Sequence, residues 1–163
     1  MFKPPLFLIA FAIVPGCLFA ADAPSQPAIY KNAADLMATL MKSAQEHPAQ
    51  ATAPIANEGH YRVNIVRRDR PGFALSHATG PAKGSEVHYI IDGAATVVTG
   101  GTIVRPAGAT GRGATNATIE GGETRHVTKG DVIVVPAGTP HWYKEVEGSV
   151  TYLEVRFDVD LGK

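Results

Sequence analysis

The sequence predicts an all-β fold, a sandwich or barrel of short strands, with one helix ahead of it. Beyond residue 59 the chain consists of short runs rich in valine, isoleucine, tyrosine and threonine, several of which alternate between apolar and polar residues. Glycine-rich turns separate these runs, and only one segment, near the N-terminus, has helical periodicity.

The first 20 residues are typical of a secretory signal peptide. They open Met-Phe-Lys, continue with an apolar stretch over 6–20 and end in small residues. The stretch is shorter than the about 20 residues of a spanning helix and is interrupted by Pro15. We therefore expect cleavage after Ala20, a periplasmic or secreted protein, and no membrane span. Residues 14–17 loosely resemble a bacterial lipoprotein processing box, so lipid attachment at Cys17 is a minor alternative.

Cleavage would leave 163 − 20 = 143 residues, which suits one domain. The removed segment contains Lys3, so the mature chain would hold 14 basic and 15 acidic residues, and this balance argues against a nucleic-acid partner. It also contains Cys17, the only cysteine. The mature protein would therefore have neither a disulfide nor thiolate chemistry.

Residues 21–58 are predicted to form a lead-in, an amphipathic helix and a linker. In 32–47 the apolar residues recur at helical spacing, Asn32 is a suitable N-cap, and Pro48 ends the pattern. The stretch 48–58 is rich in alanine and proline and is predicted to be a surface linker.

Residues 59–163 are predicted to form the β-domain. Asp92-Gly93 and Gly121-Gly122 have the composition of hairpin turns. The glycine-rich segment 100–116 is predicted to be a loop, in which Arg105 and Arg112 are weak candidates for contacts with an anionic ligand. Strands are expected at 60–68, 73–78, 86–91, 94–99, 118–120, 123–128, 132–135, 141–146 and 149–158.

The segment 130–141 carries the clearest motif. An apolar strand runs into two turn residues, Pro136 and Gly138, and the turn delivers His141. With Gly130, these residues resemble the second motif of the cupin superfamily, except that Glu145 stands where the family has asparagine. The resemblance implies a double-stranded β-helix, or jelly-roll, barrel and makes His141 a candidate metal ligand. A strand-end histidine bonded to a backbone carbonyl is the structural alternative.

A second segment, 85–93, matches only part of the first cupin motif. Glu86 and Gly93 fit its end, and the resemblance makes Glu86 a metal ligand. The preceding His-x-His pair is missing, since the chain has other residues at 79–82. His88 shares a strand face with Glu86, and His77 could reach that face by pairing across a hairpin.

The candidate metal ligands are therefore His77, Glu86, His88 and His141. Three imidazoles and a carboxylate suit zinc, iron, manganese, nickel or copper, and the ligand types alone do not choose among them. Tyr61 and Glu145 are weak candidates for a catalytic acid, base or donor beside such a metal.

These features predict an exported metal-binding cupin that holds a small organic molecule in its barrel. As an enzyme it would be an oxygenase with a redox metal, or a lyase, isomerase or cyclase with zinc. The alternatives are a non-catalytic module that binds a small ligand and an envelope protein whose barrel is only a scaffold. The resemblance also raises a homodimer formed through outer strands. The sequence shows no nucleophile elbow, which argues against a nucleophilic hydrolase.

Overall fold

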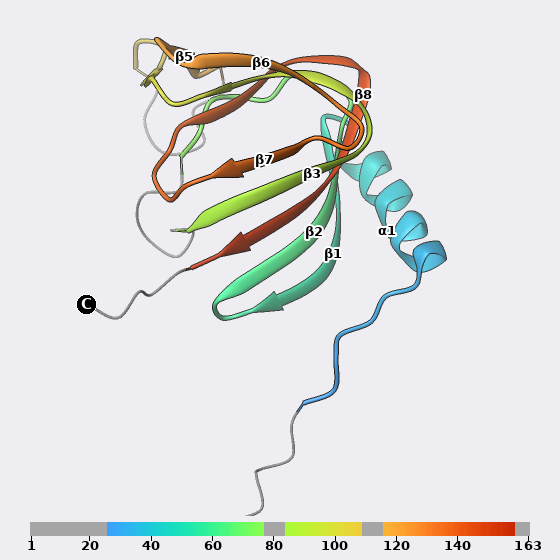
Figure 1. Ribbon diagram of the computed structural model, residues 1–163. Helices are drawn as coiled ribbons and strands as arrows, with labels where there is room; N and C mark the ends of the chain where they lie inside the picture. Colours follow the sequence, from blue (N-terminus) through green and yellow to red (C-terminus); the bar gives the residue numbers. More distant parts are fainter. Residues whose placement is uncertain (1–25, 77–83, 109–115, 159–163) are drawn as a thin grey trace, which may run out of the picture.

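The computed structural model describes residues 26–76, 84–108 and 116–158. The predicted signal peptide, with Cys17 and the cleavage site, lies outside the described residues. One helix precedes an all-β barrel of antiparallel strands, as the sequence predicts (Figure 1). The strands are β1 Gln50–Glu58, β2 Tyr61–Arg68, β3 Ser85–Thr99, β4 Thr102–Val104, β5 Thr118–Glu120, β6 Glu123–Thr128, β7 Val132–Val135 and β8 His141–Phe157.

The helix α1, Ala33–Glu46, is the one expected. Asn32 caps it, accepting a hydrogen bond from the backbone N–H of Asp35 at 2.9 Å. Its apolar face packs through Leu40 on Ala51 and Ala53 of β1, against the outside of the sheet (Figure 1).

The predicted linker over 48–58 is wrong, because 50–58 form strand β1. This strand pairs antiparallel with β2 and lies at the edge of the sheet. Alanine and proline are weak strand formers, but the small side chains of Ala51 and Ala53 let α1 approach closely. Pro54 is tolerated because the strand is at an edge and its register shifts next to this residue.

The long strands β3 and β8 organise the barrel. The sheet order is β1-β2-β8-β3-β6, and β7 also pairs with β3. The first part of β3 lies between β7 and the end of β8, whereas its second part lies between β6 and the start of β8. The two long strands thus serve both layers of the barrel, and β4 and β5 form a separate small sheet.

The hairpin predicted at Asp92-Gly93 is also wrong, because β3 continues through both residues. The register with β8 shifts on either side of Gly93, which marks a bulge. Gly93 has φ +79°, and a Cβ there would lie 1.9 Å from the carbonyl oxygen of Ser149. A left-handed bulge and a tight hairpin both favour glycine, so the local sequence does not separate them.

Four smaller differences separate the predicted elements from the observed ones. The predicted strands 141–146 and 149–158 are one strand, β8, which continues through Gly148. Gly121-Gly122 joins β5 to β6, but these strands lie in different sheets, so it is not a hairpin turn. Of the strand predicted at 73–78, Leu75 forms one isolated bridge to His141, and residues 77 and 78 lie outside the described part. The predicted loop 100–116 contains the short strand β4.

Candidate metal centre

Strand alternation builds the inner face of the barrel from β3, β8 and β2. On β3, Glu86, His88 and Ile90 point inward and are buried. The register places these residues opposite Arg156, Glu154 and Tyr152 of β8, in that order. His141 stands at the start of β8, directly after the turn that ends β7. The polar residues of the interior therefore come from a few adjacent strand positions.

Glu86, His88 and His141 form a buried cluster. Their exposed fractions are 1%, 2% and 6%. Glu86 Oε2 lies 2.9 Å from His88 Nε2 and 3.5 Å from His141 Nε2. One ligand atom from each of the three residues lies within 4.8 Å of the other two. A carboxylate oxygen thus faces two imidazole nitrogens in a space closed to solvent.

The second carboxylate oxygen of Glu86 is held by Arg156. Its Nε donates to Oε1 at 2.8 Å, and a terminal guanidinium nitrogen lies 2.7 Å from the same oxygen. Arg156 is also 3.9 Å from Glu154, which accepts a hydrogen bond from Asn64 at 3.1 Å. The guanidinium compensates the buried negative charge and leaves Oε2 directed toward the histidines.

Two stacked tyrosines support His88 from the other side. The Tyr143 hydroxyl lies 3.1 Å from His88 Nδ1. The Tyr143 and Tyr152 rings stack with centroids 5.0 Å apart, and Arg68 donates to the Tyr152 hydroxyl at 3.0 Å. Burial raises the pKa of Tyr143 well above its usual value and the pKa of Tyr152 to about 12. Both hydroxyls therefore stay protonated at neutral pH and act as hydrogen-bond partners.

The donor set fits a divalent transition metal. Nitrogen and oxygen ligands bind such ions at about 2.0–2.2 Å, so two ligands of one ion lie about 3–3.5 Å apart. The separations from Glu86 Oε2, 2.9 Å to His88 Nε2 and 3.5 Å to His141 Nε2, are close to this range. Coordination through Nε2 of His88 would leave the ring proton on Nδ1, where it can be donated to Tyr143. A neutral imidazole pair and one carboxylate suit zinc, iron, manganese, nickel or copper.

The structure brings together three of the four predicted ligands. Glu86, His88 and His141 converge, whereas His77 lies outside the described residues. Tyr61 is 43% exposed and follows the outward alternation of β2, so it does not line the interior. Glu145 is exposed and accepts a hydrogen bond from Thr96. Neither of these two weak catalytic candidates contacts the cluster.

The loop arginines give no anion site in the described residues. Arg105 is exposed, and Arg112 lies outside the described part.

Sequence reasoning missed the residues that surround the cluster. The motifs point to neither Tyr143, which contacts His88, nor Arg156, which binds Glu86. The signal was nonetheless present, because Tyr152, Glu154 and Arg156 alternate on one predicted strand. Two charged residues on the same face as a core tyrosine indicate a polar interior.

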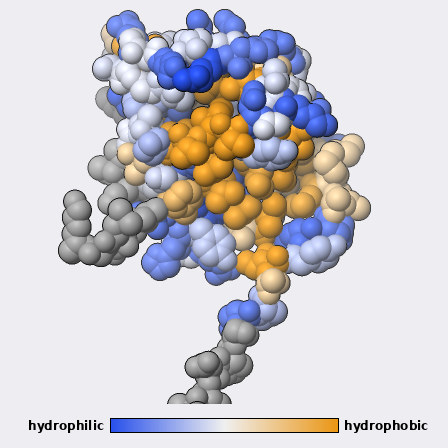
Figure 2. Space-filling view, viewed as in Figure 1, coloured by the Kyte–Doolittle hydropathy of each residue, from blue (hydrophilic) through white to orange (hydrophobic). Residues whose placement is uncertain are grey.

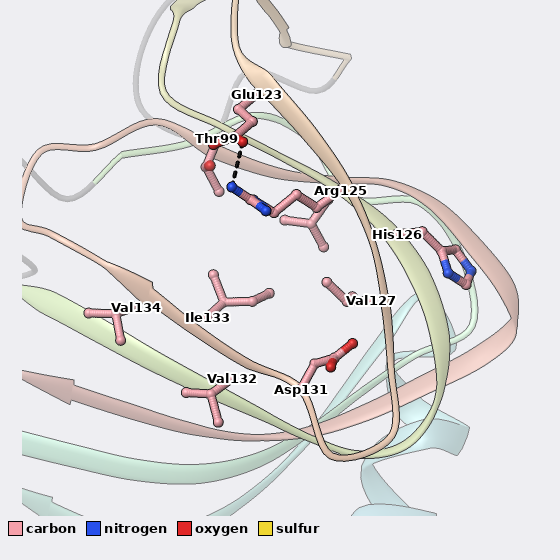
Figure 3. A pocket seen from close by; sticks show the side chains of 10 residues that line it. Thr99, Glu123, Arg125, His126, Val127, Asp131, Val132, Ile133 and Val134 are labelled. Carbon is pink, nitrogen blue, oxygen red and sulfur yellow. Dashed lines mark hydrogen bonds and ion pairs between the residues drawn. The ribbon is translucent and has the colours of Figure 1, made fainter.

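A cavity of about 650 Å³ opens between the edges of β6 and β7 (Figure 3). Val127 and Ile133 line its interior, and Arg125 pairs with Glu123 at its rim. None of the three cluster residues lines this cavity. Ile133, however, is the register partner of His88, so the cavity adjoins the strand pair that carries the cluster. Its volume suits a small organic molecule.

The fold and the cluster together define a double-layered β-barrel with a buried histidine and carboxylate centre. The chain belongs to the cupin family, whose model matches residues 47–157. This match confirms the family predicted from the motifs at 130–141 and 85–93.

Solved structures share the fold at low sequence identity. The cupin domain of Cnp3 from Schizosaccharomyces pombe has a TM-score of 0.50 and 14% identity, covering 69% of this chain and 63% of its own. KdgF from Halomonas sp. has a TM-score of 0.48 and 20% identity over 70% and 84% of the two chains. The FeII form of HppE with its substrate has a TM-score of 0.48 and 13% identity over 67% and 50%. These likenesses show the fold alone.

No match is found among curated proteins. Within the part of the chain that the structure describes, no helix has the length and apolar character needed to cross a membrane.

Proposed function

We propose that this cupin is an exported protein that binds a divalent transition metal through Glu86, His88 and His141 and holds a small organic molecule beside it. One observation carries the proposal: Glu86 Oε2 faces two imidazole nitrogens at ligand-like separations in a buried space. A buried carboxylate is costly without compensation, and Arg156 binds Glu86 through Oε1.

The residues around the cluster would prepare it for a metal. Arg156 holds Glu86 in its orientation through two nitrogens, and Tyr143 fixes the His88 ring through Nδ1. A bound metal would supply a Lewis acid that polarises a carbonyl or lowers the pKa of a water. The cavity between β6 and β7, which Ile133 lines beside His88, offers the space for an organic ligand.

Metal content of the purified mature protein tests the proposal. After expression in metal-replete medium, we expect about one equivalent in the wild type and a loss of most of it in His141→Ala. His126→Ala is the matched control, because His126 is exposed and pairs with Glu147. Wild-type protein without stoichiometric metal would refute the proposal. So would equal metal content in His141→Ala and His126→Ala.

A non-catalytic binding module is the second candidate. It is favoured by the positions of Tyr61 and Glu145, since neither supplies an acid or base beside the cluster. An enzyme would convert a ligand that the metal-loaded protein binds, whereas a module would release it unchanged. Mass spectrometry of such a ligand before and after incubation separates the two, and the appearance of product excludes the module.

Export is supported by the N-terminal pattern of residues 1–20. N-terminal sequencing of the protein recovered from a bacterial periplasm would show Ala21 as the first residue. A first residue of Cys17 would indicate the lipoprotein instead, and an intact Met1 in the cytoplasm would refute export.

We also propose a homodimer formed through the outer face of β7, β3 and β8. Val132, Val134 and Tyr89 are 59%, 63% and 45% exposed there, and Val87 and Leu153 adjoin them in register. Figure 2 shows hydrophobic residues gathered over this part of the molecule. An apolar face without charges complements a second copy of itself. Sedimentation equilibrium should show a dimer that Val134→Lys dissociates, and a monomeric wild type would refute it.

A further inference from the structure

Two arginines stand side by side on the inner face of the barrel. The register pairs Arg62 of β2 directly with Arg156 of β8, and Arg156 in turn with Glu86 of β3. The neighbouring inward residues of β2, Asn64 and Arg68, bond to Glu154 and Tyr152, which confirms that this face of β2 points inward. Like charges directly opposite on adjacent strands destabilise a sheet unless something compensates them.

Only one of the two arginines is compensated. Arg156 binds Glu86 through two nitrogens. The Nε of Arg62 is buried and has no hydrogen-bond partner. Within the described residues, no hydrogen bond or ion pair engages any other side-chain atom of Arg62 either. A buried donor without a partner costs about 1–3 kcal/mol, so the position is unfavourable for the protein alone.

A small cavity lies against this pair. Its volume is about 60 Å³, and Arg62 and Arg156 both line it, together with the turn between β1 and β2 and the end of β8. That volume suits the head group of an anion and is too small for a whole metabolite. Glu58 and Asp158 also border the cavity, but both are exposed, and within the described residues neither forms an ion pair with Arg62. His60 completes the polar lining.

We infer that Arg62, beside Arg156, binds the oxyanion group of a small ligand, and that the barrel therefore takes anionic molecules. A carboxylate or a phosphate would supply acceptors for the buried Nε and would separate two like charges. Arg62 stands two strands from Glu86, which is roughly 10 Å. Anion binding by Arg62 is independent of the proposed function. That the anion is part of the molecule held beside the metal rests on the proposed function.

Calorimetric titration of the processed protein tests the inference. Succinate and inorganic phosphate are the probes, and uncharged succinamide is the ligand control. We expect saturable binding of one of the two anions, weakened at least about tenfold in Arg62→Gln and less in Arg62→Lys. Arg67→Gln is the matched protein control, because Arg67 is on the same strand but pairs with Asp69 near the surface. The anion affinity of Arg67→Gln should equal that of the wild type. The tighter of the two anions identifies the head group.

A stability measurement adds a readout that a structural role would not give. In anion-free buffer, Arg62→Met should raise the melting temperature, because it removes the like-charge pair and the orphaned donor while keeping the apolar stem. A lower melting temperature would show that Arg62 stabilises the fold and would overturn the inference. So would the absence of saturable binding, or equal anion affinity in wild type and Arg62→Gln.

The metal and anion sites can fail separately. Arg62→Gln should retain the metal content of the wild type, and His141→Ala should bind the anion as tightly as metal-free wild type does. A wild-type protein that binds the anion but contains no stoichiometric metal would refute the proposed function alone. A wild-type protein that contains the metal but shows no saturable anion binding would refute the inference alone.

Discussion

Tyr143→Phe tests whether the tyrosine layer prepares the cluster for a metal. His88 is 2% exposed and its Nδ1 lies 3.1 Å from the Tyr143 hydroxyl, so water cannot easily replace that partner. Removing the hydroxyl leaves a buried ring N–H without an acceptor whenever Nε2 binds a metal. Such a loss costs about 1–3 kcal/mol, which is roughly 5- to 150-fold in metal affinity.

The assay is competition between the protein and a chromophoric chelator. Tyr152→Phe is the matched control, because it removes the same atom from the adjacent ring of the stack, but its hydroxyl bonds Arg68. We expect Tyr143→Phe to lose at least about tenfold in metal affinity and Tyr152→Phe to remain within a few-fold of the wild type. Tyr143→Phe within twofold of the wild type would refute the reasoning, as would an equal loss in both variants.

Two further predictions concern stability. The pKa of Tyr152 is raised to about 12, so the folded protein keeps a proton that the unfolded chain releases near pH 10. Stability is therefore lost as pH rises from 10 toward 12, by about 3 kcal/mol from this residue. Urea unfolding across that range should show a shallower loss in Tyr152→Phe, and an unchanged slope would contradict the shift. Gly93→Ala should cost several kcal/mol because its Cβ would meet the Ser149 carbonyl, whereas Gly148→Ala, with φ +71° and open space, should cost about 1–2 kcal/mol. Equal losses of stability in the two variants, measured by thermal unfolding, would show that Gly93 does not lie this close to the Ser149 carbonyl.

The sequence predicted the fold class because the strands are short, alternating and separated by glycine-rich turns. It predicted Glu86 and His88 on one face because strand alternation is a local property. It failed at Gly93 and over 50–58, where distant contacts decide the structure. A bulge against Ser149 and a strand of alanines beneath α1 are set by packing partners, which local propensity does not contain.

The neighbours of the cluster depend on register, which the sequence alone does not fix. Arg156 meets Glu86 only because β3 and β8 pair in one particular alignment. A slip of one residue would turn Arg156 and Glu154 to the outer face. The motif therefore located His141, whereas the partners of Glu86 and His88 required the structure.

The charges of the inner face lead to a coupling between the two proposed sites. Glu86 and Glu154 face three cations, Arg62, Arg68 and Arg156, which leaves one positive charge with the histidines neutral. A divalent ion would add two more, so the interior with metal favours an anion more strongly than the interior without it. At roughly 10 Å the interaction between the metal and one negative charge is about 1–3 kcal/mol for an effective dielectric constant between 80 and 20.

This coupling is reciprocal and can be measured from either side. Metal loading should tighten succinate or phosphate binding by about 5- to 150-fold, and the anion should tighten metal binding by the same factor. Titrations of the anion into metal-free and metal-loaded protein, and of the metal with and without the anion, give the two factors independently. Both factors should fall toward one in Arg62→Gln, because the anion then lacks its main partner. A factor near one in the wild type would show that the anion binds too far from the cluster for the two sites to act on one molecule.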